Sequence, residues 1–189
     1  QHIEAGQKIV NSGLTLSEYV MPGLGGREYS RENALETARV LNAINPDYIR
    51  IRTLHVISGT PLYEDLQNDK FQLLTDDKIV EELRLFINSL EGIESTITSD
   101  HIMNLLEEVQ GTLPGDKPRM LEVIDNYLSL PKQDRILFQL GRKGGGLRSP
   151  SELNDPSVRN KLQSAAQNLE QQKGKDLEEI LPELVRQYI

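Results

Sequence analysis

Residues 18–62 read EYVMPGLGGREYSRENALETARVLNAINPDYIRIRTLHVISGTPL, and this stretch decides the fold of the chain. It opens with an apolar segment that runs into a glycine turn, GLGG, at residues 23–26. Helical spacing follows over residues 31–44, and strict alternation over residues 48–54 predicts a second strand. A helix between two strands indicates a parallel pair with a right-handed crossover. The glycine turn then lies at the carboxyl end of the first strand, where α/β proteins bind ligands.

The spacing of apolar residues also predicts strands and helices before and after this unit. The first strand of the unit is expected over residues 14–22, before the glycine turn, and a third strand over residues 95–99. Ser30 and Thr75 are placed to cap helices. Helices are expected over residues 3–12, 31–44, 75–90, 102–110, 118–130 and 133–140, around 158–169, and over 177–184 with an interruption near Pro182. The pattern therefore predicts a partial α/β layer followed by an all-helical extension, with a flexible break at residues 144–146.

Composition excludes several classes of function. The chain has 189 residues and a formal net charge of -8, which argues against binding to nucleic acid or to anionic membranes. No segment is apolar enough to span a membrane and no signal segment opens the chain, so a cytoplasmic location is expected. The absence of cysteine removes disulfides, thiolate nucleophiles and cysteine-bound metal centres from this chain. Because Gln1 opens what reads as the middle of a helix, we expect a piece of a longer protein.

The alternating strand carries the first candidate side chains. Ile49, Ile51 and Thr53 are expected to face the covering helices, which directs Arg50 and Arg52 to the other side of the sheet. Two guanidinium groups there match carboxylates or phosphates, whose paired oxygens accept bidentate hydrogen bonds. The alternative is an open sheet face with solvated arginines. A pairing of Glu18 with Arg50 is a further expectation.

Three more candidates follow the strands. Asp100 and His101 come directly after the third strand, where an adjacent carboxylate and imidazole can form a general base or part of a metal site. The more common outcome is that Asp100 caps the helix expected from residue 102. His55 follows the second strand and has no partner that the sequence identifies. The glycine turn itself offers backbone groups to an adenine, a phosphate or a carboxylate, or is a plain tight turn.

Taken together, these residues resemble the second half of a radical S-adenosylmethionine (SAM) enzyme. The resemblance rests on the turn at residues 19–26 (YVMPGLGG), the strand and loop that end in Gly59-Thr60-Pro61-Leu62, and residues 99–106 (SDHIMNLL). The order is similar to that of the oxygen-independent coproporphyrinogen oxidase, Elongator-type and tRNA methylthiotransferase branches. It is most similar to an uncharacterised branch with GLGG at the turn and SDHxxNLL further on. The resemblance covers about residues 3–130.

The resemblance implies an α/β fold, specifically a partial TIM-like (β/α) barrel with parallel strands, followed by an all-α C-terminal extension. Residues 1–130 would be the C-terminal part of the barrel with its flanking helices, and residues 131–189 the extension. The implied cofactor-side residues are Gly23, Leu24, Gly25, Gly26, Arg50, Arg52 and Thr53. Candidates on the substrate side are His55, Asp100 and His101. Relatives often carry an acidic or polar residue at or after the last glycine, whereas this chain has Gly26 followed by Arg27 and Glu28.

The family's chemistry requires three cysteines, spaced CxxxCxxC, that bind a 4Fe-4S cluster which reduces SAM to a 5′-deoxyadenosyl radical. Those cysteines are expected upstream of Gln1, in the other half of the same protein. SAM and the cluster therefore belong to the full-length protein, and this chain alone is expected to bind neither, to hold no metal and to be inactive. The substrate and the type of reaction are not implied.

Two further expectations concern partners. The exposed edges of a parallel sheet cut from a barrel invite pairing, so a homodimer of this chain is expected. An alternative from a different class is a non-catalytic helical interaction module, in which residues 100–189 bind a partner protein and the β part is a scaffold.

Overall fold

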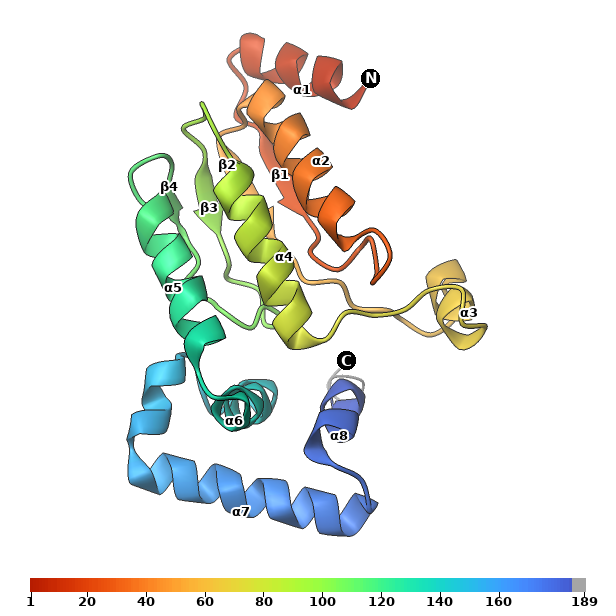
Figure 1. Cartoon of the computed structure of the whole chain (residues 1–189). Helices are drawn as coiled ribbons and strands as arrows, with labels where there is room; N and C mark the ends of the chain where they lie inside the picture. The colour runs from red at the N-terminus through yellow and green to blue at the C-terminus, as the bar shows by residue number, and fades with distance from the viewer. Residues whose placement is uncertain (185–189) are drawn as a thin grey trace. The chain divides into compact units, whose positions relative to one another are not determined.

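A computed structural model describes residues 1–184 (Figure 1), so the last five residues of the expected helical extension lie outside the described part. Two compact units divide the chain, Gln1–Asp125 and Asn126–Ile189. The elements are α1 (His2–Asn11), β1 (Ser17–Val20), α2 (Ser30–Ile44), β2 (Tyr48–Ile51), α3 (Pro61–Gln67), α4 (Asp76–Ser89), β3 (Thr96–Thr98), β4 (Gly111–Thr112), α5 (Lys117–Ser129), α6 (Lys132–Lys143), the 3-10 helix η1 (Pro150–Asn154), α7 (Pro156–Lys173) and α8 (Leu177–Leu184).

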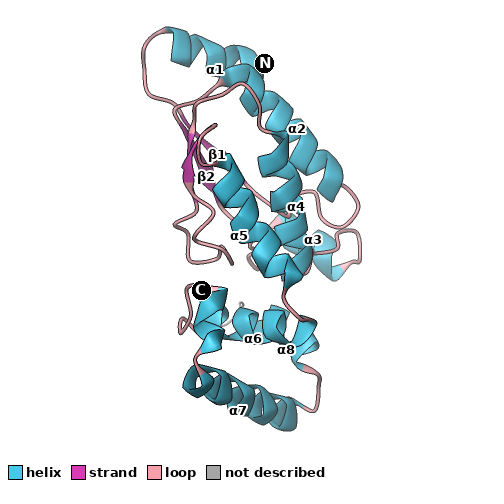
Figure 2. Cartoon of the chain, turned by 60° about the vertical axis from the view of Figure 1, so that its left-hand side comes forward, coloured by secondary structure: helices cyan, strands magenta, loops and turns pink. Residues whose placement is uncertain are grey.

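The first unit contains a four-stranded sheet with the strand order β1-β2-β3-β4. The first three strands are parallel, and β4 pairs antiparallel with β3. Helix α2 packs against both α1 and α4, and Figure 2 shows α2 and α4 on the same side of the strands. The predicted α/β class is thus present as an open sheet covered by helices on one face.

The covered face is the core of this unit. Ile49, Ile51 and Ile97 from neighbouring strands are almost completely buried, as is Val20 on β1. Helix α2 presents Ala34, Ala38 and Leu41 to this core, as the spacing predicted. The small alanine side chains allow the helix to approach the sheet closely, and the burial of this apolar surface stabilises the unit. The alternation of β2 is therefore confirmed.

Helix ends follow the predictions in part. Thr75 caps α4, since its side chain accepts a hydrogen bond from the Lys78 amide at 3.4 Å. The prediction that Ser30 caps α2 was wrong, because Ser30 is already helical and its hydroxyl binds a carboxylate of α4 instead. Pro182 lies inside α8 rather than interrupting it. The buried stripe of Leu177, Ile180 and Leu181 compensates there for the missing amide donor.

One predicted helix is absent. Residues 102–110 form turns that lead into β4, and Asp100 therefore caps no helix. The apolar residues of this segment, Leu106 and Val109 among them, are buried as a helical stripe would be, but they pack from an irregular chain. The physical reason is that side-chain hydrogen bonds of this segment compete with helix formation.

Helix α3 was not predicted. Thr60 caps it by accepting a hydrogen bond from the Tyr63 amide at 3.3 Å, and Pro61 occupies its first turn. Proline is favoured there because its fixed φ suits a helix start and its missing N–H is not needed. The Gly-Thr-Pro-Leu segment therefore has a local structural role as a helix start.

The second unit contains only helices, turns and loops over residues 126–184, in agreement with the helical extension predicted there. Its core is formed by Tyr127, Leu137, Phe138 and Ile180, all almost completely buried. Arg159 of α7 forms an ion pair with Asp134 of α6 at 2.5 Å. Helix α6 ends at Lys143 with Gly144 as its C-cap, so a helix end is found at the glycine run where a flexible break was predicted. No helix among the described residues is long and apolar enough to cross a membrane.

Candidate functional site

The glycine turn (residues 23–26) follows β1 at its carboxyl end, as predicted. Gly26 has a φ of 58°, and an added Cβ there would lie 2.7 Å from the Phe71 ring. An added Cβ on Gly25 would lie 2.5 Å from the carbonyl oxygen of Tyr29. Gly25 is therefore required by the nearby backbone, and Gly26 by its positive φ and the Phe71 ring.

Most amide donors of the turn are used inside the protein. The Leu24 N–H donates to the Met21 carbonyl at 3.2 Å, and the Gly26 N–H donates to the Gly23 carbonyl at 3.0 Å. A backbone cradle for phosphate requires several free amides that converge on one point. The turn lacks that arrangement, and it instead presents an exposed Leu24 side chain beside the strand end.

A buried carboxylate holds the turn in place. Glu82 of α4 is only 4% exposed and accepts hydrogen bonds from the Gly23 amide at 2.9 Å, the Asn33 side chain at 2.8 Å and the Ser30 hydroxyl at 2.5 Å. Asn33 also donates to the carbonyl of Met21 at 3.2 Å. Three donors satisfy a carboxylate that would otherwise be costly to bury. Helix α4 thereby fixes the end of β1.

A second buried network joins the ends of β2 and β3. The Asn104 amide donates to the Ile51 carbonyl at 2.9 Å and to the Ser99 hydroxyl at 3.1 Å. Its oxygen accepts from both the amide and the hydroxyl of Thr53, each at 3.0 Å. Ser99 in turn donates to the Leu106 carbonyl at 2.9 Å. These bonds explain two positions of the SDHxxNLL segment as structural, and they hold residues 101–110 in their irregular path.

Arg52 lies at the centre of a cluster on the open face of the sheet. Its guanidinium donates to the Asp100 carboxylate at 3.0 Å and to the Ile51 carbonyl at 2.9 Å. It also lies 5.4 Å from the centre of the Tyr19 ring, within the range of a cation–π contact. Asp100 therefore binds the arginine that directly follows the neighbouring strand rather than capping a helix, and Arg52 uses its Nη1 for both hydrogen bonds.

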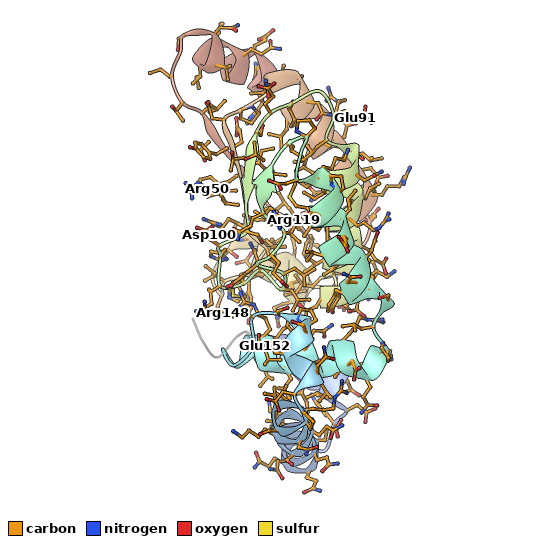
Figure 3. All side chains as sticks on the ribbon, turned by 90° about the vertical axis from the view of Figure 1, so that its left-hand side faces the viewer. Arg50, Glu91, Asp100, Arg119, Arg148 and Glu152 are labelled. Atoms are coloured by element: carbon orange, nitrogen blue, oxygen red, sulfur yellow. The ribbon has the colours of Figure 1, made fainter. Side chains whose placement is uncertain are left out.

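Arg50 projects from the same face and has fewer contacts. Its Nε donates to the Ser17 hydroxyl at 3.2 Å. Figure 3 shows Arg50 and Asp100 on one side of the sheet, away from the helices. The expected pair of Arg50 with Glu18 was wrong, because Glu18 lies beside Ile49 in the register and so shares the covered face. Glu18 forms an ion pair with His2 at 3.4 Å instead.

Two titratable groups next to Arg52 have shifted pKa values. The hydrogen bond from Arg52 holds the pKa of Asp100 below its ordinary value. Burial lowers the pKa of His101, and the positive charge of Arg52 lowers it further, whereas the Asp100 charge opposes both. The Met103 amide donates to Nδ1 of His101 at 3.3 Å, so Nε2 carries the proton of the neutral ring. His101 is thus a neutral hydrogen-bond donor at neutral pH.

The structure brings Arg52, Asp100 and His101 together, and it ties Thr53 to Asn104. It does not bring His55 into this cluster, since His55 has no hydrogen bond or ion pair in the part of the chain that the structure describes. Glu82 and Asn104 were not selected from the sequence. Asn104 belongs to the quoted SDHxxNLL segment and could have been found there, whereas Glu82 lies in an ordinary helical stripe and gives no signal.

The residues present fit only part of the implied cofactor set. The chain has no cysteine, so it offers no thiolate to an iron-sulfur cluster. Among the described residues, no group of three or more His, Asp or Glu side chains is arranged to bind a metal ion. Large apolar side chains are exposed after the strands, at Met21, Leu24 and Ile57, and these suit a flat apolar group such as an adenine. The described part of the chain therefore offers exposed apolar side chains after the strands but no thiolate for a cluster.

These features define an α/β protein with a mostly parallel sheet that is open on one face and polar at its carboxyl end. The comparisons add a relative but no family: no family model matches the sequence, and no solved structure matches it. The chain is 26% identical over 107 residues to the uncharacterised protein YtqA of Bacillus subtilis strain 168. The match covers 56% of this chain and 33% of YtqA, so the chain spans about a third of that relative.

Proposed function

We propose that this chain is the C-terminal part of a radical SAM enzyme and contributes the adenosyl side and part of the inner wall of its barrel. One observation carries the proposal. β1, β2 and β3 are parallel neighbours in chain order, and their helices α2 and α4 lie on one face. In doubly wound proteins the strand order reverses and helices cover both faces, whereas in (β/α) barrels strands follow in order and helices cover only the outside.

In the proposed enzyme the open face lines the interior of the barrel. Leu24 and Met21 contact the adenosyl group from the end of β1, while Glu82 fixes the turn that carries Leu24. Arg52, held by Tyr19 and Asp100, fixes the loop after β3. When bound, the cluster and SAM supply a 5′-deoxyadenosyl radical. The cysteines for that cluster lie upstream in the longer protein.

The first experiment tests the class of enzyme. The sequence upstream of Gln1 in the gene is expected to contain CxxxCxxC, and the longer protein, reconstituted anaerobically with iron and sulfide, is expected to form 5′-deoxyadenosine from SAM under reducing conditions. A variant with the three cysteines replaced by alanine is expected to form none. The present chain alone is also expected to form none, and the proposal fails if it does or if the longer protein does not.

The second experiment tests the adenosyl side. Leu24→Asp in the longer protein places a charge where the adenosyl group would lie, so the KM for SAM is expected to rise at least about tenfold. Leu14→Asp is the matched control, because Leu14 is also an exposed leucine but precedes β1. An equal effect of the two substitutions would remove Leu24 from the proposed site.

The alternative function, a helical module that binds a partner protein, is not supported by an exposed apolar surface on its described helices. Among the described residues from 100 onward, the one exposed large apolar side chain is Ile102, and it lies in a turn rather than on a helix. A helical surface that binds a partner protein would normally expose such residues at its centre.

A further inference from the structure

Arg50 of β2 and Arg52, which directly follows that strand, differ in their contacts, because an ion pair and a ring contact are found only for Arg52 among the described residues. Arg52 is only 20% exposed in its side chain, is paired with Asp100 and lies against the Tyr19 ring. Arg50 has a single hydrogen bond, from Nε to the Ser17 hydroxyl. Its two terminal nitrogens have no partner in the described part of the chain. Arg50 therefore keeps a planar pair of donors free on the open face.

The residue opposite Arg50 on β3 also has a polar side-chain group without a hydrogen-bond partner among the described residues. Thr98 is the register partner of Arg50 and shares the open face with it. The Thr98 hydroxyl is shielded from water and, among the described residues, has no hydrogen-bond partner. A buried polar group without a partner is unfavourable and uncommon in folded proteins. Two residues with unpaired hydrogen-bonding groups are thus neighbours in the register of β2 and β3.

The charge around this position is unusual for an acidic chain. The sequence has 29 acidic and 21 basic residues, yet the strand residues of the open face include no carboxylate, and Asp100 beyond β3 is already bound to Arg52. These strand residues are polar or cationic: Ser17, Tyr19, Tyr48, Arg50, Thr96, Thr98 and Thr112. The Ser17 hydroxyl accepts from Arg50 and keeps its own proton to donate. The face is therefore locally positive and rich in donors.

We infer that Arg50, Thr98 and Ser17 form a binding site for a carboxylate or phosphate group of a ligand. The free donors of Arg50 match two oxygens of such a group, and the hydroxyls of Thr98 and Ser17 add donors from the strands on either side. Arg52 does not bind the anion and instead fixes the loop after β3. The inference deepens the proposed function. Only the statement that the anion belongs to the substrate of that enzyme rests on the proposed function. Anion binding itself does not depend on that function.

The test titrates this chain with inorganic phosphate and, separately, with acetate, while NMR follows the side-chain Nε–Hε signals of arginine and the backbone amide of Thr98. Saturable shifts confined to Arg50, Thr98 and Ser17 are expected, and the tighter of the two anions identifies the ligand group as phosphate or carboxylate. Arg50→Gln is expected to weaken binding at least about tenfold, and Arg52→Gln less than about threefold. Arg50→Lys, which keeps the charge but loses the planar donors, is expected to fall between them.

The inference is overturned if neither anion causes saturable shifts, or if Arg52→Gln weakens binding as much as Arg50→Gln. A circular dichroism spectrum and melting curve for each variant separate a lost site from a lost fold. If Arg50→Gln unfolds the chain, Arg50→Lys and Thr98→Val decide the outcome, since unchanged binding in both would also overturn it. The formation of 5′-deoxyadenosine is a separate readout, so this inference and the proposed function fail independently.

Discussion

The two faces of the sheet are built from the same short strands but differ in what their side chains contact. On the covered face, Ile49, Ile51 and Ile97 are buried against helices, and their contacts are complete within the chain. On the open face, Tyr19 is 65% exposed, and Arg50 and Thr98 keep unpaired polar groups in the described part of the chain. The covered face therefore accounts for stability, and the open face has capacity left for a ligand.

Each side of the sheet has a residue that departs from this division. Glu82 is a charged residue on the covered side, and its carboxylate is satisfied by three donors. Arg52 is a residue on the open side whose hydrogen bonds are largely satisfied within the chain. Both exceptions hold a loop at the carboxyl end of the strands. Polar residues whose hydrogen bonds are made within the chain therefore shape the site, whereas polar residues with unpaired donors or acceptors are the candidates for ligand binding.

The largest expected effect comes from breaking the covered face. Ile49→Ala should lower the free energy of unfolding by about 3 kcal/mol, because it leaves a cavity in the core. Tyr48→Ala, its neighbour on the open face, should cost less than about 1 kcal/mol. Urea denaturation followed by circular dichroism measures both, and equal losses would contradict the division between the two faces.

The next effect concerns the network between β2 and β3. Asn104→Ala removes hydrogen bonds to Ile51, Ser99 and Thr53 and leaves buried groups unpaired, so a loss of about 2 kcal/mol in unfolding free energy is expected. Asn88→Ala on the exposed surface of α4 is the control and should change stability by less than about 0.5 kcal/mol. Denaturant midpoints of the two variants provide the comparison, and a neutral Asn104→Ala would show that the loop is held by apolar burial alone.

A smaller loss of stability is expected from a change at Glu82, the buried carboxylate on the covered side. Glu82→Gln keeps the size of the side chain but turns one acceptor into a donor facing the Ser30 hydroxyl or the Gly23 amide, at a cost of about 1 kcal/mol. Glu81→Gln, next in sequence and exposed, should cost less than about 0.5 kcal/mol because its ion pair with Lys78 is on the surface. Thermal melts measure both variants, with the Gly23 amide shift in NMR as a second readout.

The smallest effect is a pH dependence on the open face. Because burial lowers the pKa of His101 below 6.5, the folded state binds this proton less readily than the unfolded chain does. Its contribution to stability is fully present above about pH 6.5 and is lost as the pH falls through the window below that value. Arg52→Gln should raise the pKa of His101 and of Asp100 by removing a positive charge and a hydrogen bond. NMR titration of the imidazole measures the shift, and a lower His101 pKa in this variant would contradict the assignment.

Local periodicity was enough to predict much of the fold. Helix α2 follows from Ala34, Ala38 and Leu41, and the two faces of β2 follow from the alternation of isoleucine and arginine. The same rule predicted a helix over residues 102–110 and was wrong there. Apolar spacing indicates which residues are buried, but it does not reveal that the Asn104 side chain bonds to a strand more than fifty residues earlier.

The candidate site was predictable only where its partners are close in sequence or register. Arg52 and Asp100 were both selected, but their pairing depends on the alignment of β2 with β3. Glu82 was missed because its three donors lie 49 to 59 residues earlier in the chain. Ser30 was assigned as a cap for the same reason, since a local reading cannot weigh a distant carboxylate against a nearby amide.

The clamp formed by Glu82 also sets the order in which the molecule can assemble and open. The turn after β1 is synthesised early, but its Gly23 amide finds its acceptor only once α4 has docked. Amide hydrogen exchange at Gly23 should then report the undocking of α4 rather than local fraying of the turn. A ligand that favours the ordered turn would slow that exchange, so binding at the end of β1 would stabilise the docked position of α4, although α2, β2 and α3 separate the two in the chain.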